Sequence, residues 1–166
     1  MNKKSGFNNL KVTQCLKKDW SYILELLHET KLALWLTGKE KYQDFYIVKD
    51  LNTNKAIACF SISKRSSVGI LKNFAVSKTL QRKGIGTHIA NKLIPTVAKT
   101  LKIERLYLQG NNKKPYTSNS FWEKTVFEHI ESKKIKDRYF KKYFDWLVKK
   151  YTSSVLYKES VFYLEL

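Results

Sequence analysis

The sequence predicts an α/β fold in which a mixed, mostly antiparallel central sheet carries helices on both faces. Three β-rich runs follow one another over residues 44–76 with turn residues between them, which predicts an antiparallel meander. A strand–helix–strand unit over residues 69–110 adds a further strand to the same sheet. The length of 166 residues suits one domain, so we expect a single domain over residues 1–166, with residues 1–8 flexible.

The elements of this fold follow from hydrophobic periodicity. Apolar residues that recur every three or four positions predict helices, and β-rich runs bounded by turn residues predict strands. We expect strands at residues 9–16, 44–50, 56–63, 69–76, 103–110, near 127–135 and at 160–166. We expect helices at residues 19–27, 31–36 (ended by Gly38), 85–101, 118–127 and 133–151.

Two local features refine the predicted helices. Pro95 removes the hydrogen bond to the Asn91 carbonyl, which predicts a kink or break within residues 85–101. Ser120 and Glu123 have the spacing of a capping box, which predicts a helix start at Ser120.

The net charge of +18 is the most extreme feature of the composition. It favours a polyanionic partner, namely nucleic acid, a membrane surface or a phosphorylated ligand. However, the basic residues are 28 Lys and only 4 Arg, whereas surfaces that bind phosphate or bases favour the bidentate guanidinium of Arg. A Lys-rich composition also arises from A/T-biased coding, so both interpretations stay open.

The sequence also predicts where the protein resides. Cys15 and Cys59 are too few for a disulfide framework, so we expect two reduced core thiols. The N-terminus lacks the apolar segment of a signal peptide, and no apolar run approaches the roughly 20 residues of a membrane span. We therefore expect a cytoplasmic protein, with the nucleus as the alternative.

The segment Gln81–Thr87, QRKGIGT, is the motif with the clearest chemistry. It lies between a predicted strand and a predicted helix, where the first four N–H groups have no partner within the helix. Gly84 and Gly86 leave that backbone open to an anion, and Gln81, Arg82 and Lys83 add donors. The arrangement is typical of a phosphate-binding helix start.

Two common phosphate motifs do not fit this segment. A Walker A loop needs Lys after its last glycine, but Thr87 follows Gly86. A dinucleotide-binding turn needs a third glycine where Ile89 stands. What fits is Gln/Arg-x-x-Gly-x-Gly/Ala after a strand, and here the sequence resembles the GNAT superfamily of acetyl-CoA-dependent N-acetyltransferases. NFAVSKTL, RLYLQGN, SNSFWEKTVF and YLEL are similar to that family's fourth strand, fifth strand, next helix and closing strand.

The resemblance implies a GNAT-type fold and direct acetyl transfer from acetyl-CoA to a primary amine, without an acyl-enzyme. It implies that the backbone of Phe74, Ala75 and Val76 holds the pantetheine arm and thioester, with the Val76 N–H as oxyanion donor. The residues implied to bind the CoA pyrophosphate are Gln81, Arg82, Lys83, Gly84, Ile85, Gly86 and Thr87. Asn111, Ser118 and Lys124 are further candidate cofactor contacts, and each is equally well interpreted as a solvated surface residue.

The proton-transfer residues are less clear. Many relatives place a Tyr acid where this chain has Trp122, whose indole cannot act as a general acid at neutral pH. Tyr116 could reach the leaving thiolate, and the alternative is a loop aromatic that caps the sheet edge. Some relatives carry a Glu on the fourth strand, but Leu71–Asn73 of this chain contains no carboxylate. The family glycine before Phe127 is replaced by Val126.

The acceptor class follows only weakly from charge. A basic protein repels a Lys-rich tail and attracts a small phosphorylated acceptor such as an amino-sugar phosphate. The alternatives are a protein lysine or N-terminal acetyltransferase, and a catalytically weak module that binds CoA or nucleic acid. We expect no metal, because His28, His88 and His129 are scattered. The Lys-rich helix at 133–151 fits core packing with a solvated face, so we expect no nucleic-acid partner, and we expect a monomer or homodimer.

Overall fold

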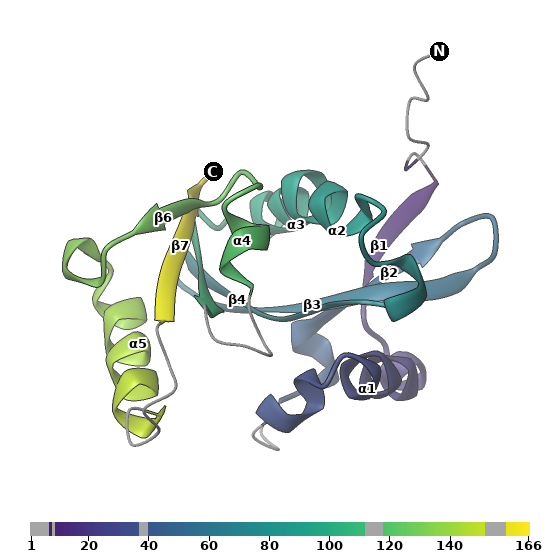
Figure 1. Cartoon of the computed structure of the whole chain (residues 1–166), viewed down its shortest axis with the longest axis horizontal. Helices are drawn as coiled ribbons and strands as arrows, with labels where there is room; N and C mark the ends of the chain where they lie inside the picture. Colours follow the sequence, from purple (N-terminus) through teal and green to yellow (C-terminus); the bar gives the residue numbers. More distant parts are fainter. Residues whose placement is uncertain (1–6, 8, 37–39, 112–117, 152–158) are drawn as a thin grey trace, which may run out of the picture. The chain divides into compact units, whose positions relative to one another are not determined.

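The computed structural model describes residues 7, 9–36, 40–111, 118–151 and 159–166 (Figure 1). Its strands are β1 (Leu10–Gln14), β2 (Phe45–Asp50), β3 (Lys55–Arg65), β4 (Val68–Val76), β5 (Arg105–Asn111), β6 (Glu128–Ile130) and β7 (Glu159–Glu165). Its α-helices are α1 (Trp20–Glu29), α2 (Ile85–His88), α3 (Ile94–Thr100), α4 (Asn119–Trp122) and α5 (Arg138–Tyr151). A π-helix spans Ile89–Leu93, and 3₁₀ turns span Lys17–Asp19, Leu32–Trp35, Tyr42–Asp44, Lys78–Leu80 and Ser132–Lys134.

The described strands form one seven-stranded sheet in the order β1-β2-β3-β4-β5-β7-β6. β4 and β5 pair in parallel, whereas β1 with β2, β2 with β3, β5 with β7 and β6 with β7 pair antiparallel. The parallel pair is joined by the helical segment that the sequence placed between these strands, as a parallel connection requires. This confirms the predicted mixed, mostly antiparallel sheet.

The chain divides into two compact units. The first comprises Met1–Ile62 and Asn73–Ile89, and the second comprises Ser63–Lys72 and Ala90–Leu166. The single domain expected over residues 1–166 stays a prediction. Residues 1–6 and 8 of the lead-in expected to be flexible lie outside the described residues.

The first unit has its core between α1 and strands β1 to β3. Ile23 and Leu27 on α1 are fully buried in one hydrophobic cluster with Phe45, Cys59 and Ala75. These helix positions lie one turn apart on the same face, as their spacing in the sequence predicts. Both cysteines are free and buried, in agreement with the prediction of core thiols.

The second unit carries helices on both faces of its strands. Phe140 on α5 stacks on Tyr107 of β5, with ring centroids 4.3 Å apart. Asn119 of α4 instead lies against Gly110 and Phe162. Because side chains alternate along a strand, the even-numbered β5 residues face away from Tyr107. α4 and α5 therefore cover opposite faces of this part of the sheet, as Figure 1 shows.

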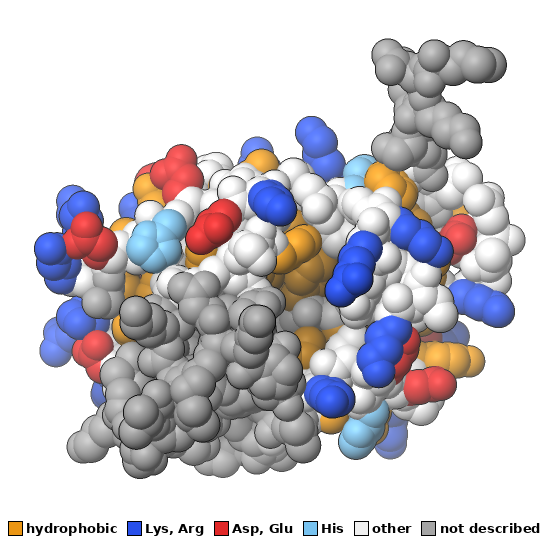
Figure 2. Space-filling view, viewed as in Figure 1, with side chains coloured by type: hydrophobic (Ala, Val, Ile, Leu, Met, Phe, Trp, Pro, Cys, Tyr) orange, Lys and Arg blue, Asp and Glu red, His pale blue; other side chains and the backbone are white. Residues whose placement is uncertain are grey.

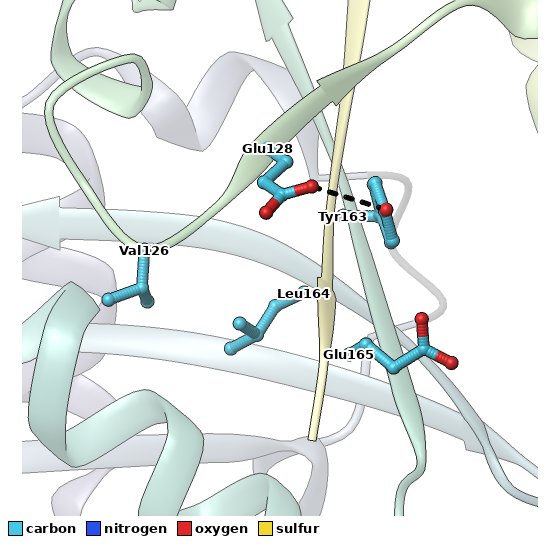
Figure 3. A pocket seen from close by; sticks show the side chains of 5 residues that line it. All are labelled: Val126, Glu128, Tyr163, Leu164 and Glu165. Carbon is cyan, nitrogen blue, oxygen red and sulfur yellow. Dashed lines mark hydrogen bonds between the residues drawn. The ribbon is translucent and has the colours of Figure 1, made fainter.

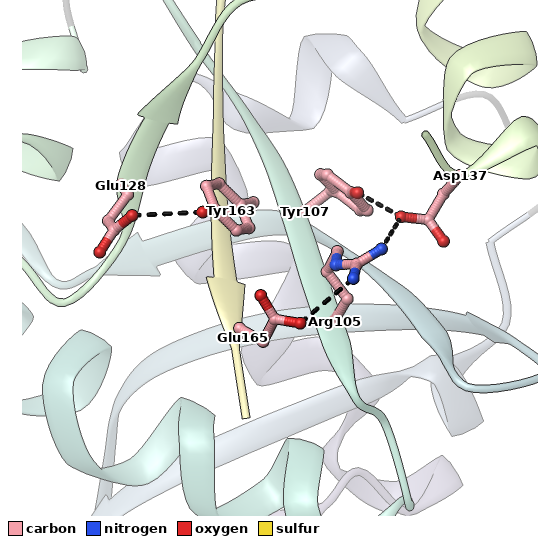
Figure 4. Close-up of polar contacts among 6 residues, drawn as sticks. All are labelled: Arg105, Tyr107, Glu128, Asp137, Tyr163 and Glu165. Carbon is pink, nitrogen blue, oxygen red and sulfur yellow. Dashed lines mark hydrogen bonds and ion pairs between the residues drawn. The ribbon is translucent and has the colours of Figure 1, made fainter. Parts of the chain in front are cut away.

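A polar network ties the start of α5 to the sheet (Figure 4). Arg105 donates to Asp137 at 2.7 Å and to Glu165 at 3.2 Å, and the Tyr107 hydroxyl donates to the same Asp137 oxygen. Burial, and then the Asp137 hydrogen bond and charge, raise the pKa of Tyr107 above its ordinary value. Its phenol therefore stays protonated, and we assign the network a structural role.

The helical segment after β4 departs from regular α-helix near Pro95, where the sequence predicts a kink or break. It runs as α2, then the π-helix Ile89–Leu93, then α3, in which Pro95 occupies the second position. The wider π turn ends two residues before Pro95 and contains Asn91, whose carbonyl would otherwise accept the N–H that proline lacks. The predicted kink is thus realised as a change of helix type.

Three other local predictions need correction. The capping box at Ser120 and Glu123 is wrong: Ser118 is the N-cap of α4, no side chain caps it, and the α-helix ends at Trp122. The helix at 31–36 is the 3₁₀ turn Leu32–Trp35, and Gly38 lies outside the described residues. The strand near 127–135 is reduced to β6, because a 3₁₀ turn follows it.

Candidate functional site

The end of β4 carries the first part of the predicted site, Phe74–Val76. Directly before it, Asn73 adopts the left-handed conformation with a φ of 52°, which is uncommon for a residue other than glycine. Its side-chain amide donates to Ser61 Oγ at 3.3 Å, and its carbonyl accepts a long contact of 3.9 Å from the Cys59 thiol. The register with β5 covers Val68–Leu71. β4 therefore leaves regular strand geometry just before the predicted thioester-binding residues.

Two side chains fix the segment between β4 and the glycine turn. The Glu29 carboxylate, at the end of α1, accepts hydrogen bonds from the Lys78 N–H at 2.6 Å and from the Ser77 hydroxyl at 3.3 Å. The Gln81 side-chain amide donates to the Val76 carbonyl at 2.8 Å. The Gln81 side-chain amide has two N–H groups, and the resemblance implies that it binds a cofactor phosphate. In the structure, one of these N–H groups holds the loop against β4.

The glycine turn itself is a tight backbone structure. Arg82 and Gly84 both have positive φ, at 60° and 81°. Gly84 is the N-cap of α2, and its carbonyl accepts the first helical hydrogen bond from the His88 N–H at 2.9 Å. No side chain in the described part of the chain caps this helix start, and its first turn holds no acidic residue. The N–H groups of Ile85–Thr87 therefore lie at an uncapped helix end, which favours an anion.

Exposure shows that this turn is reachable from solvent. Gln81–Gly84 is exposed, and Gly86 and Thr87 are half-buried. Ile85 instead points inward and is 8% exposed, so it anchors the turn in the core. The exposed side chains of Arg82 and Lys83 place two cations beside the helix start. Physically, the turn can hold a phosphate or pyrophosphate through backbone N–H groups, with the cations adding attraction.

The remaining predicted cofactor contacts belong to the second unit. Asn111 is the last residue of β5, and its side chain lies outside the described part of the structure. Ser118 starts α4, where its carbonyl accepts the N–H groups of Phe121 and Trp122 at 3.1 Å each. Lys124 is exposed just after α4. The structure thus brings Phe74–Val76 and Gln81–Thr87 together in one unit and leaves these three in the other.

The position of the expected family acid is filled by a packed core residue. Trp122 is 6% exposed and makes edge-on contacts with Phe121 and Phe127, at centroid distances of 4.8 and 5.3 Å. An indole N–H has no acidic proton to give at neutral pH. Tyr116, the alternative acid, lies outside the described residues.

Sequence reasoning missed three residues beside the site: Phe7, Glu29 and Asn73. Glu29 left no signal, because a carboxylate on the polar face of a helix is ordinary. Asn73 gives a weak signal in the sequence. Asn is uncommon in β-strands, and it adopts the left-handed conformation more readily than most residues. Phe7 lies within the stretch expected to be flexible, yet its ring contacts Gly84 and His88.

A small hollow on the second unit has the wrong chemistry for a phosphate. Figure 3 shows it lined by Val126, Glu128, Tyr163, Leu164 and Glu165. Its volume of about 160 Å³ is below the roughly 300 Å³ of a typical ligand pocket. The Tyr163 hydroxyl donates to Glu128 at 3.3 Å, and the charge of Glu128 raises the pKa of Tyr163. The two carboxylates would repel an anion.

The face drawn in Figure 2 shows no single cluster of basic side chains among its coloured residues. Figure 2 shows Lys and Arg side chains dispersed among uncharged surface over the visible face. Within the described residues, no group of three or more His, Cys, Asp or Glu side chains could hold a metal ion. In the same part of the chain, no helix has both the length and the apolar character needed to cross a membrane.

The glycine turn follows β4 and starts the helical segment that leads to β5, the parallel partner of β4 in the mixed seven-stranded sheet. Comparison with known families identifies the class further: residues 11–125 match the Acetyltransferase (GNAT) family. The chain therefore belongs to the GNAT family. No match was found among curated proteins.

Solved structures share the fold. N-acetylglutamate synthase from Neisseria gonorrhoeae, complexed with coenzyme A and N-acetyl-glutamate, has a TM-score of 0.66 and 15% identity over 95% of this chain. This chain spans 35% of that protein's chain. Rv2747 from Mycobacterium tuberculosis, in complex with CoA and NLQ, has a TM-score of 0.64 and 19% sequence identity. The match covers 94% of this chain and 99% of that one. A GNAT family acetyltransferase from Elizabethkingia anophelis, with acetyl-CoA bound, has a TM-score of 0.62 and 17% sequence identity. The match covers 96% of this chain and 99% of that one.

Proposed function

We propose that this protein is an acyltransferase that moves the acetyl group of acetyl-CoA directly to the primary amine of a small molecule. The observation that carries the proposal is the uncapped glycine turn at Gly84–Thr87, reachable from solvent and flanked by Arg82 and Lys83. Its N–H groups match the pyrophosphate of coenzyme A. CoA or acetyl-CoA is bound in the Mycobacterium and Elizabethkingia structures, which supports the same donor here.

In this proposal the donor is held mostly by backbone. The N–H groups of Ile85, Gly86 and Thr87 take the pyrophosphate, and the backbone of Phe74–Val76 takes the pantetheine arm. Gln81 has a double role, because one side-chain N–H holds the loop at Val76 and the other stays available for the phosphate. Asn111, Ser118 and Lys124 are proposed as contacts to the rest of the cofactor.

The chemistry requires a neutral amine, a polarised carbonyl and a protonated leaving group. The amine first loses its proton, since an alkyl ammonium has a pKa near about 10. Its nitrogen then attacks the thioester carbonyl, and the Val76 N–H stabilises the oxyanion. Collapse breaks the carbon–sulfur bond, the nitrogen releases its extra proton to solvent, and the departing thiolate takes a proton from a side-chain donor that solvent reprotonates. We propose Tyr116 as the donor of that proton, because Trp122 is a buried indole.

We propose a small anionic acceptor, with an amino-sugar phosphate as the model compound. The net charge of +18 repels a Lys-rich tail and attracts a phosphorylated amine. The N-acetyl-glutamate in the Neisseria structure is likewise small and anionic. A protein lysine or N-terminus is the second acceptor class. A catalytically weak CoA-binding module is the other alternative, favoured by Trp122 in place of the family Tyr.

The donor is tested by thermal unfolding with and without acetyl-CoA. A ligand at 100 times its Kd stabilises the folded state by about 2.7 kcal/mol, which raises the unfolding temperature. Acetyl phosphate, which lacks the pyrophosphate, serves as the control and should leave it unchanged. No shift with acetyl-CoA would contradict the proposal.

The acceptor is tested by release of the CoA thiol against a matched panel. The panel pairs an amino-sugar phosphate with its unphosphorylated sugar, and adds a lysine peptide and a peptide with a free N-terminus. We expect the highest kcat/KM with the phosphorylated amine. Faster turnover of a peptide would favour the protein acceptor, and stabilisation by acetyl-CoA without turnover of any amine would favour the weak module.

A further inference from the structure

Phe7 lies just before β1, and its backbone is hydrogen-bonded to the first residue of that strand. Its carbonyl accepts a hydrogen bond from the Leu10 N–H at 3.3 Å, and Leu10 begins β1. The backbone of Phe7 is thus tied to the sheet, and the ring projects from a defined place. It is half-buried, so it packs against the protein.

The ring packs on the glycine turn. The position that a Gly84 side chain would occupy lies 3.6 and 3.7 Å from two carbons of the Phe7 ring, which is van der Waals contact. The ring also meets the imidazole of His88, with centroids 5.2 Å apart and planes tilted by 44°. Phe7 therefore covers the side of Gly84 from which a side chain is missing.

Gly84 and His88 form one flank of the helix start. They lie four positions apart, so they share a face of the helix, and the His88 N–H donates to the Gly84 carbonyl at 2.9 Å. The Phe7 ring thus lies over the first hydrogen-bonded turn. The N–H groups of Ile85–Thr87 instead point along the helix axis toward its start. The ring braces the turn from the side and leaves the end of the helix open.

Such a brace matters because the turn is conformationally demanding. Arg82 and Gly84 both hold positive φ, and a non-glycine residue in that region is disfavoured by about 1 kcal/mol or more. Glycine also has the largest backbone freedom to lose. A ring fixed against Gly84 restricts the alternatives, so the N–H groups are preorganised before an anion arrives.

We propose that Phe7 is a positioning residue for the pyrophosphate loop, which it holds in its anion-binding conformation through Gly84 and His88. This inference rests on the proposed function, since it takes CoA as the ligand of the loop. It adds Phe7 to the donor site and predicts that the effect is specific to ligands that carry the pyrophosphate.

The test compares Phe7→Ala with the unaltered protein by calorimetric titration with CoA and with pantetheine, which has the thiol arm but no phosphate. We expect Phe7→Ala to raise the Kd for CoA by about tenfold, because preorganisation is lost, and to leave the Kd for pantetheine unchanged. Phe7→Leu and Phe7→Tyr, which keep a bulky apolar group on Gly84, should restore most of the affinity. Tyr22→Ala, which removes an aromatic that is 53% exposed elsewhere in the same unit, is the matched control.

Each other outcome overturns the inference. Equal weakening of CoA and pantetheine would mean a general structural role for Phe7, and tighter CoA binding by Phe7→Ala would mean that the ring obstructs the site. An unchanged Kd for CoA, or no rescue by Leu and Tyr, would also refute it. Absence of CoA binding by the unaltered protein would instead refute the proposed function, and this inference with it.

Discussion

The glycine turn at Gln81–Thr87 and the short helix region Ser118–Lys124 were both assigned to the site, yet they are built by opposite means. The turn offers backbone N–H groups, and its side chains serve mainly to hold the backbone: Gln81 bonds to the Val76 carbonyl at 2.8 Å. The α4 region offers side chains, and its central residue, Trp122, is 6% exposed in an aromatic cluster.

The contrast explains why the motif that binds the acetyl donor can be inferred from the sequence, whereas the residue that protonates the leaving thiolate cannot. A backbone site leaves a mark in the sequence, because positive φ and close approach of an anion both require glycine. A side-chain site depends on which groups the fold brings together, and many residue types fill such positions. Two glycines show the same difference. Gly84 is required for its positive φ and for access to the backbone, whereas Gly110 is required because Asn119 and Phe162 pack against it.

The largest effect we predict is on the backbone site. Gly86→Val places a branched side chain at the helix start beside the proposed pyrophosphate, and CoA binding should fall below detection in titration. Stability should not fall, because Gly86 lies in α2 and glycine within a helix is itself unfavourable by roughly 0.5–1 kcal/mol. Lys99→Ala, an exposed change farther along the same helical segment, is the control. Normal CoA binding by Gly86→Val would refute the loop assignment.

The packing glycine should behave in the reverse way. In Gly110→Ala the new methyl group would overlap Asn119 Oδ1 and lie 2.8 Å from the Phe162 ring. Overpacking of this kind destabilises by roughly 1–3 kcal/mol, measurable by urea unfolding. Gly110→Ala combined with Asn119→Ala should lose less than the sum of the two single changes, because the overlap is shared. Full additivity would place the strain elsewhere.

A third prediction concerns pH and the core beneath β4. Burial, and then the nearby Cys15, raise the pKa of Cys59 to about 12. The folded state therefore keeps a proton that the unfolded chain loses above pH of about 9, so stability declines as pH rises from there, by up to about 1.4 kcal/mol per pH unit. Cys59→Ala should flatten the fall in unfolding temperature between pH 9 and 11 more than Cys15→Ala does. Equal slopes in all three proteins would contradict the assignment.

The smallest effect is expected at Glu29. Glu29→Ala removes the acceptor of the Lys78 N–H and the Ser77 hydroxyl, which costs about 1 kcal/mol, as the loss of a helix cap does. We expect a severalfold rise in the Kd for CoA. Glu29→Gln keeps an acceptor oxygen and should lie close to the unaltered protein. A Gln variant as weak as the Ala variant would mean that the charge, rather than the hydrogen bond, is required.

Much of the fold could be predicted because periodicity reports burial. The spacing of Ile23 and Leu27 placed α1, and the strand–helix–strand pattern placed the parallel pair β4 and β5. The errors fall at short elements. Ser120 and Glu123 have capping-box spacing, but packing of Asn119 against Gly110 starts α4 earlier, so tertiary contact overrides a local signal.

The candidate site divides along the same line. The sequence predicts the turn at Gly84–Thr87. It does not predict that Glu29 holds Ser77 and Lys78, 48 and 49 positions away, or that Phe7 packs on Gly84. Neither residue type is unusual where it stands in the sequence. Long-range contacts of this kind follow from strand order and helix docking, which a local motif does not encode.

The central claim is that the N–H groups at the start of α2 bind the pyrophosphate of coenzyme A, and amide NMR tests it most directly. Titration of the ¹⁵N-labelled protein with CoA should give the largest shifts at the amides of Gly84–Thr87, and pantetheine should leave these amides in place. Unchanged Gly84–Thr87 amides in the presence of saturating CoA would contradict the account.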